Sequence, residues 1–137
     1  MANTNISDIT EGGVALGENK FKESQLLDEG IKAGMVVMKT ATGIDKHNLD
    51  AYFLGIMKEH EEFDLDTEIT AGKYGDVITE GYCAIFIENP AATRYAGTFL
   101  YKGLGGSMCI TAMGSPFAVL ERTIVTGDTV AIVKLLR

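Results

Sequence analysis

The sequence predicts a small all-β fold with little helix, either a barrel or a sandwich. A turn cassette of the form Ile-x-Ala/Thr-Gly occurs three times, at 31–34, 69–72 and 124–127, and a β-branched stretch follows each copy. Glycine reaches turn conformations that strain other residues, and Val and Ile favour strands. The cassettes are 38 and 55 residues apart. Such unequal spacing argues against a solenoid repeat, so we interpret the cassettes as recurrent turn chemistry in one barrel.

Short apolar runs separated by turn signals support the same fold class. We expect strands at 35–39, 52–57, 74–79, 82–88, 98–101, 108–113, 117–121 and 129–136. Both alternating faces of 82–88 are apolar, which predicts a strand buried on both sides. The turn signals include a hairpin or loop at 40–48 and a flexible turn at 103–107. A minor helical content is expected at 23–29 and 49–62.

The chain length and the uneven composition predict one domain with an extension. A chain of 137 residues is long enough for a single domain with a real core. Residues 1–20 are polar, with few and isolated apolar side chains. We therefore expect a flexible N-terminal arm at 1–20 and a β-barrel-like domain at 21–137.

The charge and hydropathy patterns disfavour two classes of partner. The formal net charge is −7 and the 12 basic residues are scattered. Binding to nucleic acid needs clustered Lys and Arg, so none is expected. The N-terminus has no apolar signal region, and no stretch approaches the ~18 apolar residues of a membrane span. We expect a protein made in a cytoplasm, with no membrane partner.

The residues that could support catalysis do not form a recognisable constellation. The glycine-rich turn at 103–107 lacks the Lys of a phosphate-binding loop, and Ser115 stands in Gly-Ser-Pro rather than in a nucleophile elbow. Two histidines leave little for acid–base work. Cys83 and Cys109 lie in apolar stretches and are expected to be buried free thiols, although a disulfide between them stays open. We predict no catalytic residue, no cofactor and no enzymatic activity.

The densest charged cluster is the acidic stretch at 59–68. Its oxygen ligands would suit a hard cation such as calcium. The spacing does not match an EF-hand, because Ile69 stands at the sixth position counted from Asp64. His60 has no second histidine nearby, since His47 is thirteen residues away. We expect a solvated loop or a charged surface for a partner and no metal site. A small metal- or ligand-binding barrel remains the alternative.

Several stretches of the chain are similar to one known family. The segments 30–37, 52–56, 69–77 and 126–133 resemble the capsid decoration (cement) proteins of tailed bacteriophages. In their usual pattern a Gly-x-Val strand is followed by a Gly-Ile/Val strand and a Gly-x-x-Val strand. The resemblance covers roughly residues 28–137.

The resemblance implies a barrel or β-tulip on the outside of an icosahedral head. Such proteins often form homotrimers at local three-fold axes and staple neighbouring major capsid subunits, and none of their residues is catalytic. The expected location is therefore the capsid surface of the virion. On the arm, Ile6, Ile9, Val14 and Leu16 would be the capsid contacts, by addition of a strand to a capsid sheet. Another assembly role, in a tail or a spike, is the alternative.

Overall fold

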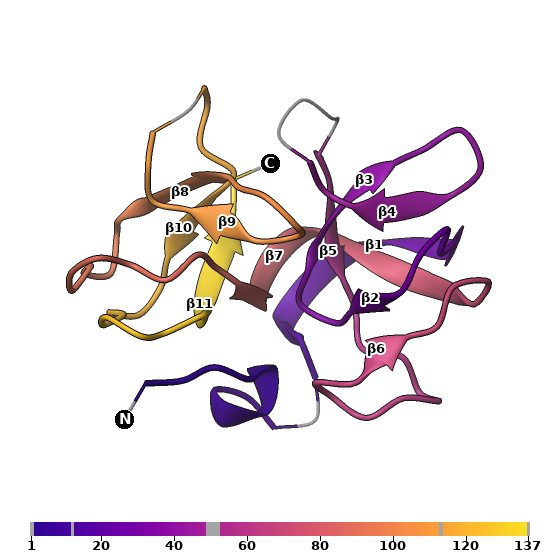
Figure 1. The fold of residues 1–137 in the computed structure, drawn as a ribbon, viewed down its shortest axis with the longest axis horizontal. Helices are drawn as coiled ribbons and strands as arrows, with labels where there is room; N and C mark the ends of the chain where they lie inside the picture. Colours follow the sequence, from indigo (N-terminus) through magenta and orange to yellow (C-terminus); the bar gives the residue numbers. More distant parts are fainter. Residues whose placement is uncertain (1, 12, 49–52, 113, 137) are drawn as a thin grey trace.

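The computed structural model describes residues 2–11, 13–48, 53–112 and 114–136, and its fold is nearly all-β. One strongly curled sheet forms a half-barrel, in the strand order β4-β3-β5-β7-β11-β10-β8-β9 (Figure 1). Strand β1 pairs with β7 beside this path, and β2 and β6 form a separate pair. The all-β prediction is confirmed. No helix among the described residues is long and apolar enough to cross a membrane.

The elements follow one another closely along the chain. They are the 3₁₀ turn η1 (Ile6–Asp8), β1 (Ala15–Leu26), β2 (Ile31–Lys32), β3 (Val36–Lys39), β4 (Ile44–Lys46), β5 (Phe53–Met57), β6 (Glu68–Ile69), β7 (Tyr74–Phe86), β8 (Phe99–Lys102), β9 (Met108–Cys109), β10 (Ala118–Leu120) and β11 (Val130–Leu135). The strand predicted at 108–113 is only two residues long. Within the predicted loop at 40–48, residues 44–46 form β4.

The two helix predictions are wrong where the structure describes them. Residues 23–26 belong to β1, in which Gln25 pairs with Gly75 of β7. Residues 53–57 form β5, and 49–52 lie outside the described residues. Pairing with β7 overrides the weak local preference for helix in both segments.

Strand β7 runs through the position where the sequence predicted a break between two strands. Gly81 has φ +112°, and a Cβ atom there would lie 2.0 Å from Asn19 Oδ1. The glycine thus lets one long strand bend beside β1 without ending. Beyond it, Cys83, Ala84 and Ile85 are all buried, as predicted for a strand covered on both faces.

All three sequence cassettes form the same kind of turn. In each, the residue after the glycine donates its N–H to the carbonyl two residues before the glycine. The bonds are Met35 N to Lys32 O (3.1 Å), Lys73 N to Thr70 O (3.3 Å) and Asp128 N to Val125 O (3.0 Å). The glycines have φ +94°, +91° and +100°, as type II turns require at their third position. The turn prediction is confirmed.

A fourth turn of this kind lies at 94–97, where Thr98 N donates to Tyr95 O and Gly97 has φ +95°. This fourth turn shows that the fold contains a repeat. Arg94 pairs with Ile124 as Ile31 of β2 pairs with Ile69 of β6. The four turns therefore form two pairs, one in each half of the chain.

The strands divide into two equivalent units, the first unit (residues 20–79) and the second unit (residues 82–135). In the first unit β3 pairs with β4 and β5, and β5 pairs with β7. In the second unit β8 pairs with β9 and β10, and β10 pairs with β11. The opening strand of each unit pairs with its closing strand: β1 with β7, and the end of β7 with β11. Figure 1 shows the first unit on the right and the second on the left.

Hydrogen bonds outside the ladders repeat in the same way. Gly34 N donates to Met57 O in the first unit, and Gly97 N donates to Leu120 O in the second, both at 2.8 Å. Leu27 N to Lys73 O is matched by Ile87 N to Thr129 O, both at 2.9 Å. Asp28 N to Ile44 O, at 3.0 Å, is matched by Glu88 N to Met108 O, at 2.8 Å. The isolated parallel bridges Leu27–Ile44 and Ile87–Met108 match as well. One backbone design is therefore built twice, which corrects the interpretation of the cassettes as turns in one unrepeated barrel.

The two units also bury matching side chains. The core of the first unit consists of Leu27, Ile31, Val37, Ile44, Met57, Ile69 and Val77. The second unit has Ile87, Arg94, Leu100, Met108, Leu120, Ile124 and Val133 at the matching positions. Six of these seven are buried and apolar, and Arg94 is the exception. The matching side chains of the first unit form a separate core, whereas those of the second unit belong to a larger core that also contains Ile6 and Val14.

Aromatic rings join the two units. Phe53 of the first unit and Phe117 of the second stack with their centroids 4.3 Å apart. His47 is buried and meets both rings edge-on. The turn at 103–107 adds a backbone bond, from Val36 N to Gly106 O at 2.7 Å. The units therefore form one packed body.

Replacing two cassette glycines separates backbone strain from crowding. We expect Gly72→Ala to lower the free energy of unfolding by about 1–2 kcal/mol, because its φ is positive while nothing lies within 4 Å of the new Cβ. Gly34→Ala should cost about 1–3 kcal/mol more, since its Cβ would lie 2.7 Å from Ile6 Cδ1. Denaturant unfolding measures both, with Ala71→Ser as the surface control. Equal losses at the two glycines would contradict this assignment.

Candidate functional site

The N-terminal segment, the described residues up to Val14, is packed against the rest of the chain rather than forming a separate arm. Ile6 and Val14 are fully buried in the larger core, and Ile6 lies on Gly34 at the first cassette turn. Ile9 and Leu16 are half-buried. This corrects the expectation of a flexible arm. Ile6 and Val14, two of the side chains expected to contact a capsid, are instead buried within the chain itself.

Polar bonds hold the N-terminal segment at both ends. Asn3 N donates to the buried carboxylate of Asp128 at 2.7 Å, and Thr129 N donates back to Asn3 O at 2.9 Å. Val14 O accepts from Ala84 N at 3.0 Å, so the segment joins the edge of β7 just before β1 begins. The segment thus completes the chain's own sheet and core.

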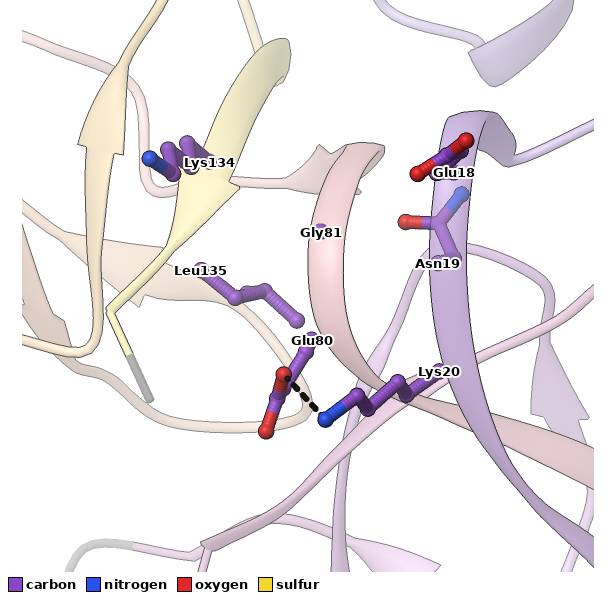
Figure 2. Close-up of a pocket in the computed structure, with 7 residues that line it drawn as sticks. All are labelled: Glu18, Asn19, Lys20, Glu80, Gly81, Lys134 and Leu135. Carbon is purple, nitrogen blue, oxygen red and sulfur yellow. Dashed lines mark ion pairs between the residues drawn. The ribbon is translucent and has the colours of Figure 1, made fainter.

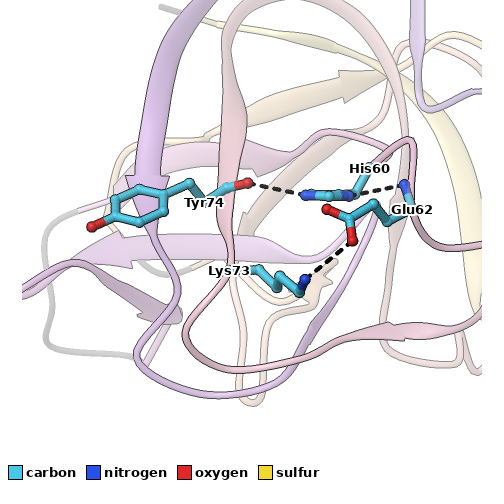
Figure 3. Close-up of polar contacts among 4 residues, drawn as sticks. All are labelled: His60, Glu62, Lys73 and Tyr74. Carbon is cyan, nitrogen blue, oxygen red and sulfur yellow. Dashed lines mark hydrogen bonds and ion pairs between the residues drawn. The ribbon is translucent and has the colours of Figure 1, made fainter.

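The acidic loop at 59–68 supplies two of the acceptors that fix this segment. Glu59 Oε2 accepts from Val14 N at 2.8 Å, and Asp66 accepts from the backbone and hydroxyl of Ser7. His60 is held in the loop: Nε2 lies 3.1 Å from Tyr74 O, and Nδ1 accepts from Glu62 N at 3.1 Å (Figure 3). Glu62 pairs with Lys73 at 3.1 Å. Several polar side chains of the loop therefore serve to hold the N-terminal segment and the loop itself in place.

The loop does not assemble a metal centre in the structure as described. Across residues 2–11, 13–48, 53–112 and 114–136, no three His, Cys, Asp or Glu side chains are grouped so that they could hold an ion. Glu61 and Asp64 remain exposed on the loop. Their charge is available to a partner surface.

Both thiols are free and buried, which settles the alternative that the sequence left open. Burial raises the pKa of Cys83 to about 12. Burial also raises the pKa of Cys109, and a hydrogen bond and charge from Glu88 add to the shift. Because the thiolate is the reactive form, neither side chain is poised as a nucleophile.

An open groove of about 570 Å³ lies where the two units meet at Gly81. Lys134 and Leu135 of β11 line one side and the 18–20 stretch of β1 lines the other (Figure 2). The Lys20–Glu80 ion pair crosses it at 3.4 Å between exposed side chains, so it adds little stability. The groove offers mixed charges to solvent at the joint between the units.

Exposed apolar side chains concentrate on the second unit. Of the seven large exposed hydrophobic residues in the described chain, five belong to it: Tyr82, Tyr95, Phe99, Leu104 and Val125. Tyr95 is the most exposed, at 70%, and lies on the 94–97 turn. Val125 lies on the neighbouring cassette turn, because Arg94 and Ile124 pair directly. The pair of turns presents an aromatic and an aliphatic side chain at one end of the unit.

The sequence did not single out this surface as a candidate. Tyr95 lies outside the predicted strands and Phe99 lies in the strand predicted at 98–101, and only the strand neighbours reveal which face each side chain takes. The Ala-Gly dipeptides at 33–34 and 96–97, each followed by a lysine five residues after the glycine, are the signal that could have matched the two units.

No family model matches the sequence. No curated protein matches it either.

Truncating two N-terminal side chains tests whether the segment is structural. We expect Ile6→Ala to lower the free energy of unfolding by about 3 kcal/mol, because a fully buried side chain leaves a cavity. Ile9→Ala, at a half-buried position, should cost under about 1 kcal/mol. Urea unfolding of both variants measures the difference. An unchanged stability in Ile6→Ala would restore the flexible arm.

Thiol labelling tests the buried cysteines. At pH 8 we expect native protein to react with a disulfide reagent far more slowly than unfolded protein, because burial disfavours both thiolates. Cys109 should label before Cys83, whose pKa is raised to about 12. The Cys83→Ala variant assigns the faster phase. Rapid labelling of two thiols in the native state would contradict this order.

Proposed function

We propose that the protein is a structural virion subunit that binds the outside of an icosahedral phage head and stabilises contacts between major capsid subunits. The resemblance to capsid decoration proteins motivates the proposal, and the all-β fold is compatible with it. In this role the chain is not an enzyme and needs no cofactor. It acts as a homo-oligomer, with a trimer as the expected state.

The observation that carries the proposal is the exposed pair of turns on the second unit. Tyr95 and Val125 project from turns whose backbone is fixed by hydrogen bonds between Arg94 and Ile124, at 2.9 and 2.8 Å. Side chains on fixed turns lose little entropy on binding, and an exposed tyrosine is a common anchor of protein interfaces. We assign the capsid contact to this end of the second unit rather than to the N-terminal segment.

A modest contact at this site would suffice on a lattice. Copies joined in an oligomer bind neighbouring capsid subunits at high effective concentration, so the second and third contacts become intramolecular. The oligomer as a whole then binds the head more tightly than any single contact would.

Binding to heads tests the proposal. We expect the purified protein to bind expanded heads prepared without it and to raise their resistance to heat. Tyr95→Asp should weaken this binding by about tenfold or more, because it places a charge at the anchor. Sedimentation with heads, followed by quantification of the bound protein, gives the affinity.

A matched variant controls for a general loss of surface apolarity. Leu104→Asp changes another exposed side chain of the second unit, on the turn that contacts the first unit, and should bind heads as the wild type does. Failure of the wild type to bind heads, or binding to tails or spikes in their place, would contradict the proposed role. Equal loss in both variants would contradict the assigned contact.

A further inference from the structure

The repeat in the fold allows one surface of the second unit to be compared with its equivalent in the first. Four residues lie directly opposite one another across the strands of each unit, and so share one face. The first row is Phe21, Ile78, Ile56 and Val36, and the second row is Tyr82, Lys134, Val119 and Phe99. The two rows occupy the same positions of the repeated backbone.

The chain covers three of the four residues of the first row, all but Phe21, which is 42% exposed, whereas three of the four residues of the second row are exposed. Ile78, Ile56 and Val36 are at most 1% exposed and belong to the larger core, with Ile6 and Val14 and with residues of the second unit. In the second row Phe99 is 49% exposed and Tyr82 is 41% exposed. Lys134 is exposed between them, with its ammonium 5.7 Å from the centroid of the Tyr82 ring. Phe21 and Tyr82 are exposed alike, but over the other strands this face is internal in the first unit and open at Lys134 and Phe99 in the second.

The charges of the chain indicate what covers the open face. Residues 1–80 carry 7 basic and 16 acidic side chains, a formal charge of −9, whereas residues 81–137 carry 5 basic and 3 acidic side chains, a charge of +2. The basic part of one copy is therefore complementary to the acidic part of another. Contact between two second units would instead bring like charges together.

The acidic part offers one surface with a fitting composition. Glu61 and Asp64 are exposed on the loop, and His60 of the loop is bonded to the backbone carbonyl of Tyr74, a residue that is 61% exposed and whose ring points away from His60 (Figure 3). The two exposed carboxylates of this loop are complementary in charge to the exposed lysine of the second row. Apolar contact at the centre and charges around it are the usual anatomy of a protein interface.

We propose that the second row packs against the acidic loop of a second copy of this chain, in a head-to-tail contact. The two surfaces belong to different units, so each copy donates one and receives one. Such a contact generates a closed ring when its rotation closes. The inference rests on the proposed function only in requiring that copies assemble, and it concerns a different surface from the Tyr95 turn.

Light scattering after size exclusion tests this contact on the full chain. The wild type should elute as an oligomer of the 14.7 kDa protein at low salt, and its mass should fall as salt is raised. Lys134→Glu should weaken association at least tenfold. The double variant Lys134→Glu/Glu61→Lys should recover it, because every head-to-tail contact then regains an opposite-charge pair.

Two further variants make the result specific. Lys22→Glu reverses an exposed charge of the first unit, outside the second row, and should leave the oligomer intact. Phe99→Asp should abolish association while the circular dichroism spectrum stays native, since this side chain lies outside the core. A monomeric wild type, an oligomer unaffected by Lys134→Glu, or a double variant that stays monomeric would each overturn the proposal.

The outcomes are separable from those of head binding. Oligomers that form as described but do not bind heads would contradict the proposed function alone. A wild type that binds heads through Tyr95 but is a monomer in solution would overturn this inference alone. Loss of head contact in Lys134→Glu without any change in oligomer mass would assign the second row to the capsid, and would likewise overturn it.

Discussion

The left-handed backbone at the glycine of each tight turn is the constraint on which the rest of the structure depends. At Gly34 and Gly97, which have this conformation, the N–H group donates to the carbonyl at the end of a partner strand, Met57 of β5 or Leu120 of β10. The strand that follows is thereby aligned with its partner from its first residue. A side chain at these positions would be strained, so glycine is a requirement of the fold and not only a preference of the turn.

Because the turn is used four times, the chain builds the same unit twice and then uses the two copies differently. The inner positions match, with buried apolar side chains at nearly every pair. The positions of the two rows differ between the units, since Ile56 and Ile78 of the first row correspond to Val119 and Lys134 of the second row. One unit is thus specialised to pack within the chain, together with the N-terminal segment. The other keeps its face open, and we propose that assembly covers it.

The sequence predicted those parts of the structure that local chemistry decides. The cassette glycines, the hairpin turn at 103–107 and the doubly buried end of β7 all follow from residues close together in the chain. The N-terminal segment was misjudged because its contacts join residues up to 125 positions apart, as from Asn3 to Asp128. Its polar composition is typical of a flexible tail, and two isolated apolar residues, Ile6 and Val14, decide otherwise. The fourth turn was missed because Arg94 stands where the other cassettes have isoleucine. The exposed row could not be predicted, since exposure depends on which strand lies beside each residue.

An experimental structure of the assembled protein tests the central claim most directly, through the solvent exposure of Phe99. The account predicts that this side chain, 49% exposed in the single chain, becomes buried against the acidic loop of a neighbouring copy. A Phe99 that stays as exposed in the assembly as in the single chain would contradict it.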